Sequence, residues 1–160
     1  MKRYFLALIA CSSLLFSCST SFDEKHEAIF DDQIWTKGEE VTFLPLIHEA
    51  TQAKKIELDV QHIYGYDIAG FDLKMKITAP SGTEILAQDY FIKIKGDDGK
   101  VLSQCSGDYC DLTQVLESNY TFPENGEYTI TLEQNTHAES VAGFLSVRLK
   151  IKDAEAPKAD

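Results

Sequence analysis

Cys18 offers the clearest chemistry in this chain. It ends the sequence LFSC at residues 15–18, which follows a basic start and an almost unbroken apolar run over residues 4–16. This order is typical of a bacterial lipoprotein signal peptide, in which a peptidase cuts before the cysteine and leaves its thiol carrying lipid. The apolar run is too short to span a bilayer stably. We therefore expect residues 1–17 to be a signal peptide and Cys18 to be the site of lipid attachment.

Two alternatives to this assignment stay open. Cys11 also follows a small residue, but cleavage there would leave an apolar core of only seven residues, 4–10. The second alternative is an ordinary secretory signal with incidental cysteines, and Phe16 is bulky for a position two before a lipid-carrying cysteine. If Cys18 is acylated, more than one acyl chain should hold the protein on a membrane, because each buried methylene contributes about 0.8 kcal/mol.

Cys105 and Cys110 are the remaining cysteines, in the sequence CSGDYC. In an oxidising compartment of the cell envelope, such a close pair predicts a disulfide. The loop it closes is short, so the chain-entropy model gives only about 2 kcal/mol, and we expect the bond to pin a loop. Free thiols and a metal site are the alternatives, although a metal would find only Asp108 and Asp111 as further ligands nearby. A redox-active pair would favour Cys-x-x-Cys spacing at a helix start.

The other polar residues form no recognisable catalytic or metal-binding pattern. The four histidines are scattered without ligand spacing; they are His26, His48, His62 and His137. The sequence GDDG at 96–99 lacks the Asp-x-Asp repeat and distal Glu of a calcium loop, so it predicts a hairpin turn. A Gly-x-Ser-x-Gly nucleophile motif is absent. We therefore expect no enzyme activity, no metal, no cofactor and no small-molecule substrate.

Aromatic residues raise the possibility of carbohydrate binding. Trp35, Tyr64, Tyr66 and Phe71 could form a flat platform on which sugar rings stack, or they could pack in the core or at a sheet edge. Exposed coplanar rings would favour the first interpretation, and rings buried between two sheets would favour the second. Tyr64 and Tyr66 flank Gly65 and are the best candidates for an exposed loop that contacts a partner.

The elements that position these residues are predicted to be β-strands. Apolar and polar residues alternate with a period of two, which places one face of each strand in a core. The alternating segments are 41–43, 56–60, 71–77, 90–94, 128–132 and 145–151. Turn residues separate them. The spacing predicts an all-β, antiparallel β-sandwich of Ig-like or jelly-roll-like type, with His62 as a satisfied histidine in it. A short helix is predicted at residues 112–118.

Composition divides the rest of the chain. Residues 18–32 are polar and acidic and predict a flexible tether. Residues 33–152 hold the β-sandwich domain, and residues 153–160 predict a disordered tail. The formal net charge of −11 should repel nucleic acid.

Several features occur in a familiar order. Trp35 is followed by the strand at 56–60, the Tyr-containing turn at 64–71 and the sequence APSG at 79–82. Then come Asp-Gly at 98–99, Gly-Asp at 107–108, residues 122–128, and VAGF at 141–144. This order resembles the GldH family of gliding-motility lipoproteins of Bacteroidota. Gln61 replaces an arginine that this family tends to have, and the Cys105–Cys110 pair is not a family feature.

The resemblance implies a function in the cell envelope rather than in catalysis. It implies an outer-membrane lipoprotein that takes part in gliding and the associated protein secretion, with no catalytic residue. We expect contacts with other envelope lipoproteins or with motility and secretion components. The periplasmic side is favoured over the cell surface, because acidic residues near the anchor begin only at Asp23. The alternative function is a carbohydrate-binding surface lipoprotein with the same fold.

Overall fold

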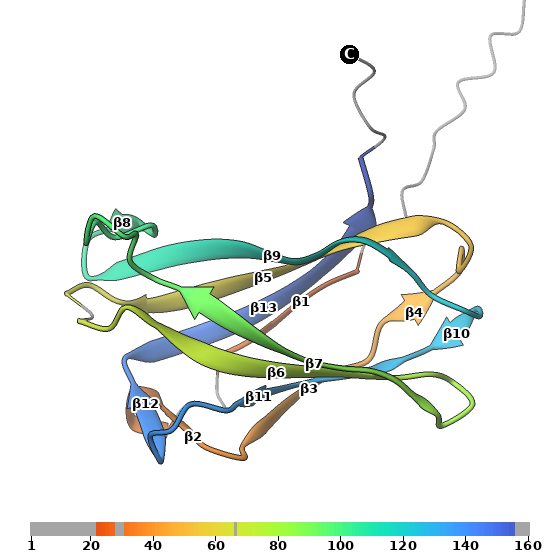
Figure 1. Cartoon of the computed structure of the whole chain (residues 1–160), viewed down its shortest axis with the longest axis horizontal. Helices are drawn as coiled ribbons and strands as arrows, with labels where there is room; N and C mark the ends of the chain where they lie inside the picture. The colour runs from red at the N-terminus through yellow and green to blue at the C-terminus, as the bar shows by residue number, and fades with distance from the viewer. Residues whose placement is uncertain (1–21, 28–30, 66, 156–160) are drawn as a thin grey trace, which may run out of the picture.

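Two antiparallel β-sheets packed against each other form the fold of the computed structural model, which describes residues 22–27, 31–65 and 67–155 (Figure 1). The first sheet has the order β1 (Phe22–His26), β13 (Phe144–Asp153), β5 (Ala53–Ile63), β9 (Tyr109–Thr121) and β8 (Gln104–Ser106). The second has the order β3 (Glu40–Phe43), β11 (Thr129–Gln134), β6 (Gly70–Thr78) and β7 (Glu84–Lys93). The predicted antiparallel β-sandwich is confirmed.

Two small ribbons complete the structure. β10 (Gly126–Glu127) pairs with β4 (Leu46–Ile47), and β12 (Ser140–Ala142) pairs with β2 (Ile34–Thr36). A single turn of 3-10 helix, η1 (Asp31–Gln33), precedes β2. No helix within the described ranges is long and apolar enough to cross a membrane.

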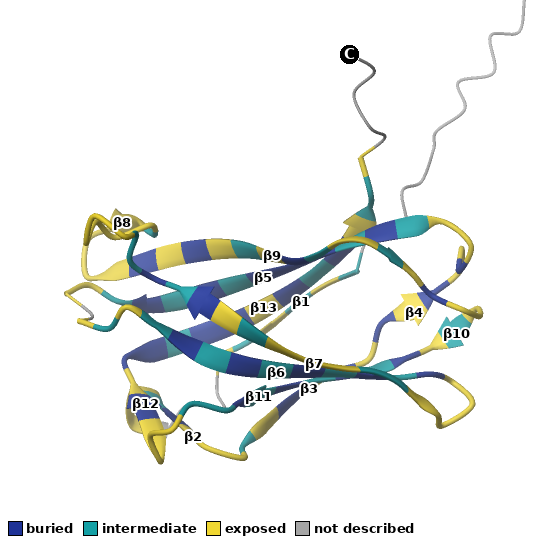
Figure 2. Ribbon diagram, viewed as in Figure 1, coloured by how far each residue is buried: buried dark blue, intermediate teal, exposed yellow. Residues whose placement is uncertain are grey.

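Strand periodicity builds the core between the two sheets. Along β6, buried and half-buried residues alternate from Phe71 to Ile77, which Figure 2 shows as alternating dark and light bands. The same alternation covers most of β13 but changes at its start, where the pairing register shifts between Phe144 and Ser146. This bulge buries both of those residues and leaves Leu145 only half-buried. The expected inward position of Leu145 is therefore wrong.

An aromatic cluster fills one part of the core. Trp35 is fully buried, and its ring centroid lies 5.4 Å from that of Phe144 and 6.1 Å from that of Phe71. Phe71 and Phe144 contact each other edge to face at 4.9 Å. The indole N–H of Trp35 donates to the Glu39 carbonyl oxygen at 3.0 Å. Trp35 and Phe71 thus belong to the core and not to a platform for sugars.

The helix predicted at residues 112–118 is wrong, because this segment lies inside β9. Leu112 and Leu116 are both buried, and a spacing of four residues satisfies the period of a helix as well as that of a strand. Pairing with β5 decides between the two, since Leu112 lies opposite Val60 and Gln114 lies opposite Leu58.

The sandwich is longer than the sequence predicts at both ends. β1 lies within the expected tether and pairs with β13, with Phe22 opposite Ile151, so the tether prediction is wrong for residues 22–26. Asp153, expected in the disordered tail, is the last residue of β13 and pairs with Lys54. The signal peptide, Cys18 and residues 156–160 lie outside the described residues.

β5 runs the length of the first sheet, so its first and last residues mark the two ends of the sandwich. Near its start, Ile56 lies opposite Ile151, which in turn lies opposite Phe22. At its other end, Ile63 lies opposite Tyr109, next to the hairpin of β8 and β9. The seven residue steps from Ile56 to Ile63 span about 23 Å at 3.3 Å per residue. The chain therefore enters the sandwich at the end opposite Tyr64.

Candidate functional site

Cys105 and Cys110 close the hairpin between β8 and β9. They lie directly opposite each other in the register, with their Cα atoms 3.9 Å apart, and their sulfur atoms are bonded. The next pair, Ser106 and Tyr109, leaves a two-residue turn in which Gly107 has a φ of 65°. Glycine adopts this left-handed conformation without the steric cost of a Cβ, so the turn suits a tight hairpin. The bond thus joins the edge strand β8 to the long strand β9.

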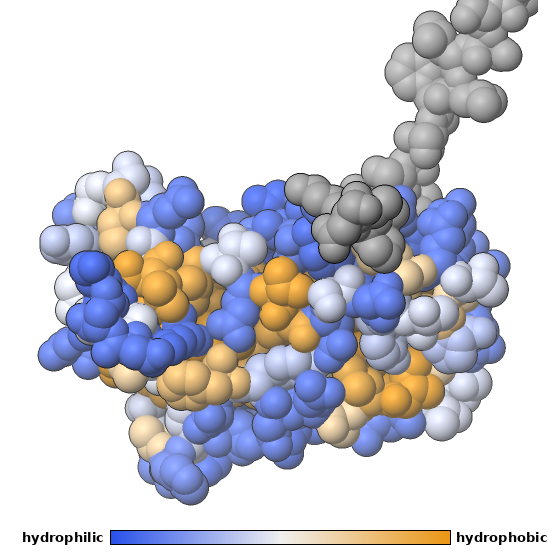
Figure 3. Space-filling view, turned by 45° about the horizontal axis from the view of Figure 1, so that its top comes forward, coloured by the Kyte–Doolittle hydropathy of each residue, from blue (hydrophilic) through white to orange (hydrophobic). Residues whose placement is uncertain are grey.

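Tyr64 lies beside this hairpin and is exposed. Its N–H donates to the Asp108 carbonyl oxygen at 2.8 Å, and 68% of the residue is exposed. We call the exposed apolar residues at this end of the sandwich the distal patch; they are Tyr64, Val101, Leu102 and Tyr109. Tyr66, predicted to contact a partner together with Tyr64, lies outside the described residues. Figure 3 shows apolar atoms gathered at this end between hydrophilic side chains.

A hollow of about 320 Å³ opens within this end of the molecule. It is lined by His62, Tyr64, Gly65, Val101 and the disulfide. The buried His62 is held by two contacts: Nε2 lies 2.7 Å from the Ser103 hydroxyl, and Nδ1 lies 2.9 Å from the Ile63 carbonyl oxygen. A carbonyl oxygen only accepts, so Nδ1 donates to Ile63, while the Ser103 hydroxyl can either donate to Nε2 or accept from it. His62 is the satisfied histidine that the sequence predicts, and its contacts are structural.

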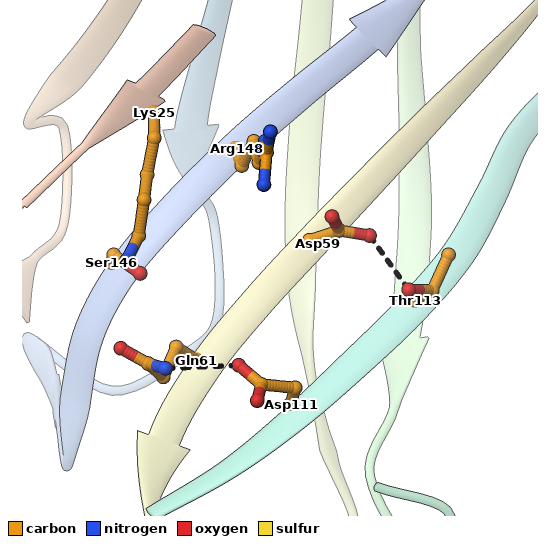
Figure 4. Close-up of a pocket in the computed structure, with 7 residues that line it drawn as sticks. All are labelled: Lys25, Asp59, Gln61, Asp111, Thr113, Ser146 and Arg148. Carbon is orange, nitrogen blue, oxygen red and sulfur yellow. Dashed lines mark hydrogen bonds between the residues drawn. The ribbon is translucent and has the colours of Figure 1, made fainter. Parts of the chain in front are cut away.

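A second hollow of about 320 Å³ lies on the outer face of the first sheet (Figure 4). Its lining comes from four strands; the residues are Lys25, Asp59, Gln61, Asp111, Thr113, Ser146 and Arg148. The Thr113 hydroxyl donates to Asp59 at 2.6 Å, and the Gln61 amide donates to Asp111 at 3.0 Å. Lys150 also pairs with Asp59, at 2.8 Å. Asp59, Gln61, Asp111 and Thr113 thus bond within this sheet face.

Neither hollow holds a set of groups for catalysis or for metal binding. In the part of the chain that the structure describes, no cluster of three or more His, Cys, Asp or Glu residues could hold a metal ion. The distal patch combines exposed aromatic and aliphatic side chains, of which Tyr109 lies on the disulfide-linked hairpin itself. Of this patch, the sequence predicts Tyr64 alone. Tyr109 lies opposite Ile63, the neighbour of Tyr64, and Val101 lines the same hollow as Tyr64.

Arg148 on β13 fastens the edge strand β1 to the sheet through Asp23. The guanidinium bonds both carboxylate oxygens of Asp23, with Nη2 and Oδ2 2.6 Å apart. These bonds hold the pKa of Asp23 below its usual value. A depressed pKa means that the pair stabilises the fold fully above the unfolded pKa of about 4, and that this contribution disappears as the pH falls through the folded value. Both side chains are substantially exposed, so solvent reduces the effect.

We expect acid to loosen β1 first. In wild type, lowering the pH from 6 to 3 should speed amide exchange in residues 22–26, after correction for intrinsic rates, more than in β5. Asp23→Asn should exchange faster at pH 6 and should lose most of this pH dependence. Asp97→Asn is the control, because the ion-pair partner of Asp97 is Lys93, four residues away on β7 of the second sheet and not on β1 or β13. An Asp23→Asn profile that follows wild type at every pH would contradict the assignment.

Comparison with known proteins gives one family match and several distant structural likenesses. A model of the GldH lipoprotein family matches residues 22–151. No match is found among curated protein sequences.

The structural likenesses are weak. Latent PorU from Porphyromonas gingivalis is 12% identical with a TM-score of 0.35, over 85% of this chain and 13% of that one. The delta-endotoxin Cry8Ea1 from Bacillus thuringiensis is 12% identical with a TM-score of 0.44, over 76% and 19%. A family 35 carbohydrate binding module from Clostridium thermocellum is 10% identical with a TM-score of 0.34, over 79% and 97%. The chain thus spans less than a fifth of the first two proteins, and none of these likenesses bears on its function.

Proposed function

The chain belongs to the GldH lipoprotein family, and from this membership we propose that it is a lipid-anchored, non-catalytic component of gliding motility and of the associated protein-secretion machinery. Its place would be the periplasmic side of the outer membrane, with Cys18 as the lipid attachment site. Its contacts would be other envelope lipoproteins or motility and secretion components. The family match supports the link to gliding. The polar side chains that line the two hollows hydrogen-bond to neighbouring protein groups, which supports a role by contact.

The position of the distal patch is the observation that carries the contact role. Phe22 is the first described residue of the sandwich, and it is four residues from Cys18. Four residues reach at most about 14 Å, so an anchor at Cys18 would keep the sandwich close to the bilayer. Tyr64 lies at the other end of β5 from Phe22. The distal patch would therefore face away from the anchored end, where partner proteins can reach it.

Anchoring makes weak contacts sufficient. Proteins confined to one membrane meet at a high effective concentration, so a partner needs little intrinsic affinity. Exposed tyrosine and aliphatic side chains are suited to such contacts, because tyrosine contributes a large apolar area together with a polar end. The distal patch has this composition.

Changing Cys18→Ala should move the protein from the membrane fraction to the soluble periplasmic fraction, because no acyl chain could then be attached. Fractionation followed by immunoblotting measures the shift, and mass spectrometry of the processed amino terminus identifies the acyl groups. Cys11→Ala is the matched control and should stay on the membrane. Release of Cys11→Ala together with retention of Cys18→Ala would move the anchor to Cys11.

Crosslinking in living cells tests the partner class. A photoreactive phenylalanine at Tyr64 or Tyr109 should form adducts with motility or secretion components, identified by mass spectrometry. The same probe at the exposed Glu40, on the other sheet, is the control. Tyr64→Ser should reduce both the adducts formed from Tyr109 and the gliding speed without changing the amount of protein. Failure to crosslink such components, combined with binding to a glycan array, would instead support the carbohydrate-binding alternative.

A further inference from the structure

β7 ends the second sheet and has one open edge. Its inner side pairs with β6, with Phe91 opposite Asp72, Asp89 opposite Lys74 and Ala87 opposite Lys76. Among the residues that the structure describes, no strand pairs with its outer side. An edge of this kind presents main-chain donors and acceptors to which another chain can bind.

Gln114 on β9 shows how that edge is used. Its side-chain oxygen accepts from the Lys93 N–H at 3.2 Å, and its side-chain nitrogen donates to the Phe91 carbonyl oxygen at 3.0 Å. One amide group thus gives the two hydrogen bonds that the backbone of a neighbouring strand would give. Gln114 belongs to the opposite sheet, so it covers the β7 edge where the two sheets meet. Next to it, the Tyr90 hydroxyl donates to Glu117 at 2.6 Å.

The same geometry shows which main-chain groups remain open. In an antiparallel pair, the N–H and C=O of alternate residues point to the same side. The Phe91 C=O and the Lys93 N–H point away from β6, toward Gln114. The pairing register is continuous from Phe91 to Leu86, so the main-chain N–H and C=O groups of Asp89 and Ala87 also point away from β6. Both are exposed, and no described residue bonds to their backbone groups. The register shifts beyond Leu86, so the regular open edge covers residues 87–89, between Gln114 and this irregularity.

We propose that the β7 edge at residues 87–89 accepts an extended segment of a partner protein, which adds a fifth strand to the second sheet. Backbone hydrogen bonds to Ala87 and Asp89 provide the attachment, as in other strand additions. Gln114 sets the register, because it blocks pairing beyond Asp89. This inference goes beyond the proposed function and does not depend on a role in gliding.

Side chains beside the edge define the chemistry of the segment. Asp89 and Phe91 point to the same outer surface of the sheet, and 51% of Phe91 is exposed. Lys74 and Lys76 lie opposite Asp89 and Ala87 on β6, and the Asn135 side-chain amide donates to Asp89 at 3.2 Å, so Asp89 is the acidic group on the open edge itself. A lysine or arginine opposite Asp89, followed on the same face by an apolar residue near Phe91, is complementary to this surface. Figure 3 shows apolar and hydrophilic atoms interspersed along the region between the sheets.

A second copy of this chain fits the edge less well than a basic partner. Each copy has a formal net charge of −11, and its open edge presents the same Asp89 carboxylate. Like charges brought together across two strands are destabilising. Self-pairing is therefore an outcome that the experiment must be able to detect.

Hydrogen exchange of the full chain, purified in detergent, tests the proposal with defined peptides. The probes are acetylated TKTVTKT, in which lysine and valine alternate along one face, its acidic counterpart TETVTET, and the interrupted TKTVPKT. Saturation with the basic peptide should slow exchange of the Ala87 and Asp89 amides by about tenfold or more while leaving β1 unchanged. The acidic and interrupted peptides should have no effect.

Two variants distinguish edge pairing from nonspecific attraction. Ala87→Pro removes an outward N–H that β6 does not use, so the sandwich should remain folded while the protection by the basic peptide is lost. Ala87→Ser is its matched control and should bind like wild type. Asp89→Lys keeps every backbone group and should reverse the preference toward the acidic peptide.

Three results would overturn the inference. The first is unchanged exchange at residues 87–89 at saturating basic peptide. The second is equal protection in Ala87→Pro and Ala87→Ser. The third is protection that grows with protein concentration in the absence of peptide, which would assign the edge to self-association.

Discussion

Replacing Trp35 with alanine should lower the free energy of unfolding by about 3–5 kcal/mol. Trp35 is fully buried and contacts Phe71 and Phe144, so the change removes its share of the core and leaves a cavity between their rings. It also removes the donor that bonds the Glu39 carbonyl oxygen. Urea denaturation followed by circular dichroism measures the loss, because the chain has only one tryptophan and its fluorescence disappears with it.

Two further variants separate the contributions of Trp35. Trp35→Phe keeps an aromatic ring but lacks the N–H, so it should lose less stability than the alanine variant. Tyr64→Ala serves as the exposed control and should change the free energy of unfolding by no more than about 0.5 kcal/mol. A Trp35→Ala variant as stable as Tyr64→Ala would mean that the buried aromatic cluster does not exist.

Period-two patterns predict most of the fold because they depend on neighbouring residues alone. Long strands such as β6 and β13 have one face in the core and one face toward solvent, and this alternation is visible in the sequence. Residues 112–118 fail as a prediction because their apolar spacing fits two periods, and only pairing with β5 selects the strand. Leu145 fails because a bulge changes the face that each residue occupies.

Distant pairing explains what the sequence does not predict about the surfaces. Tyr64 is predictable because aromatic residues beside a glycine suggest an exposed loop. Tyr109 joins it because β9 pairs with β5, and Val101 lines the same hollow; neither neighbour of Tyr64 follows from a local pattern. Gln114 is equally hidden, since its role depends on the two sheets meeting at β7. Trp35 illustrates the opposite error, because a ring suited to sugar stacking is also suited to a core.

The sequence predicts β1 and the end of β13 to lie outside the domain for the same reason. Residues 22–26 are mostly polar, so composition favours a tether. Their strand depends on pairing with β13 and on the Arg148–Asp23 contact, more than a hundred residues away. The family match, which begins at residue 22, agrees with the longer domain. At the end of β13, Asp153 has a second role that involves a buried charge.

Replacing Asp153 with asparagine should destabilise the sandwich more than replacing the lysine with which it pairs. Lys54 is only 2% exposed, and its ammonium lies 2.5 Å from Asp153 and 3.7 Å from Glu49. Asp153→Asn removes the nearer of the two carboxylates and leaves Glu49, at 3.7 Å, beside the buried ammonium. A buried charge without full compensation is costly. We expect a loss of about 2 kcal/mol, below the range for fully buried pairs, because Asp153 itself is partly exposed.

Lys54→Met should be nearly neutral, within about 1 kcal/mol, because methionine keeps the apolar packing of the lysine stem while both carboxylates stay in contact with water. Urea denaturation of the two single variants and of Lys54→Met/Asp153→Asn completes a double-mutant cycle. In the double variant the cost of Asp153→Asn should largely disappear, since no buried ammonium remains to be compensated. If Lys54→Met costs more than Asp153→Asn, the ion pair contributes net stability and the buried ammonium is not the source of the asymmetry.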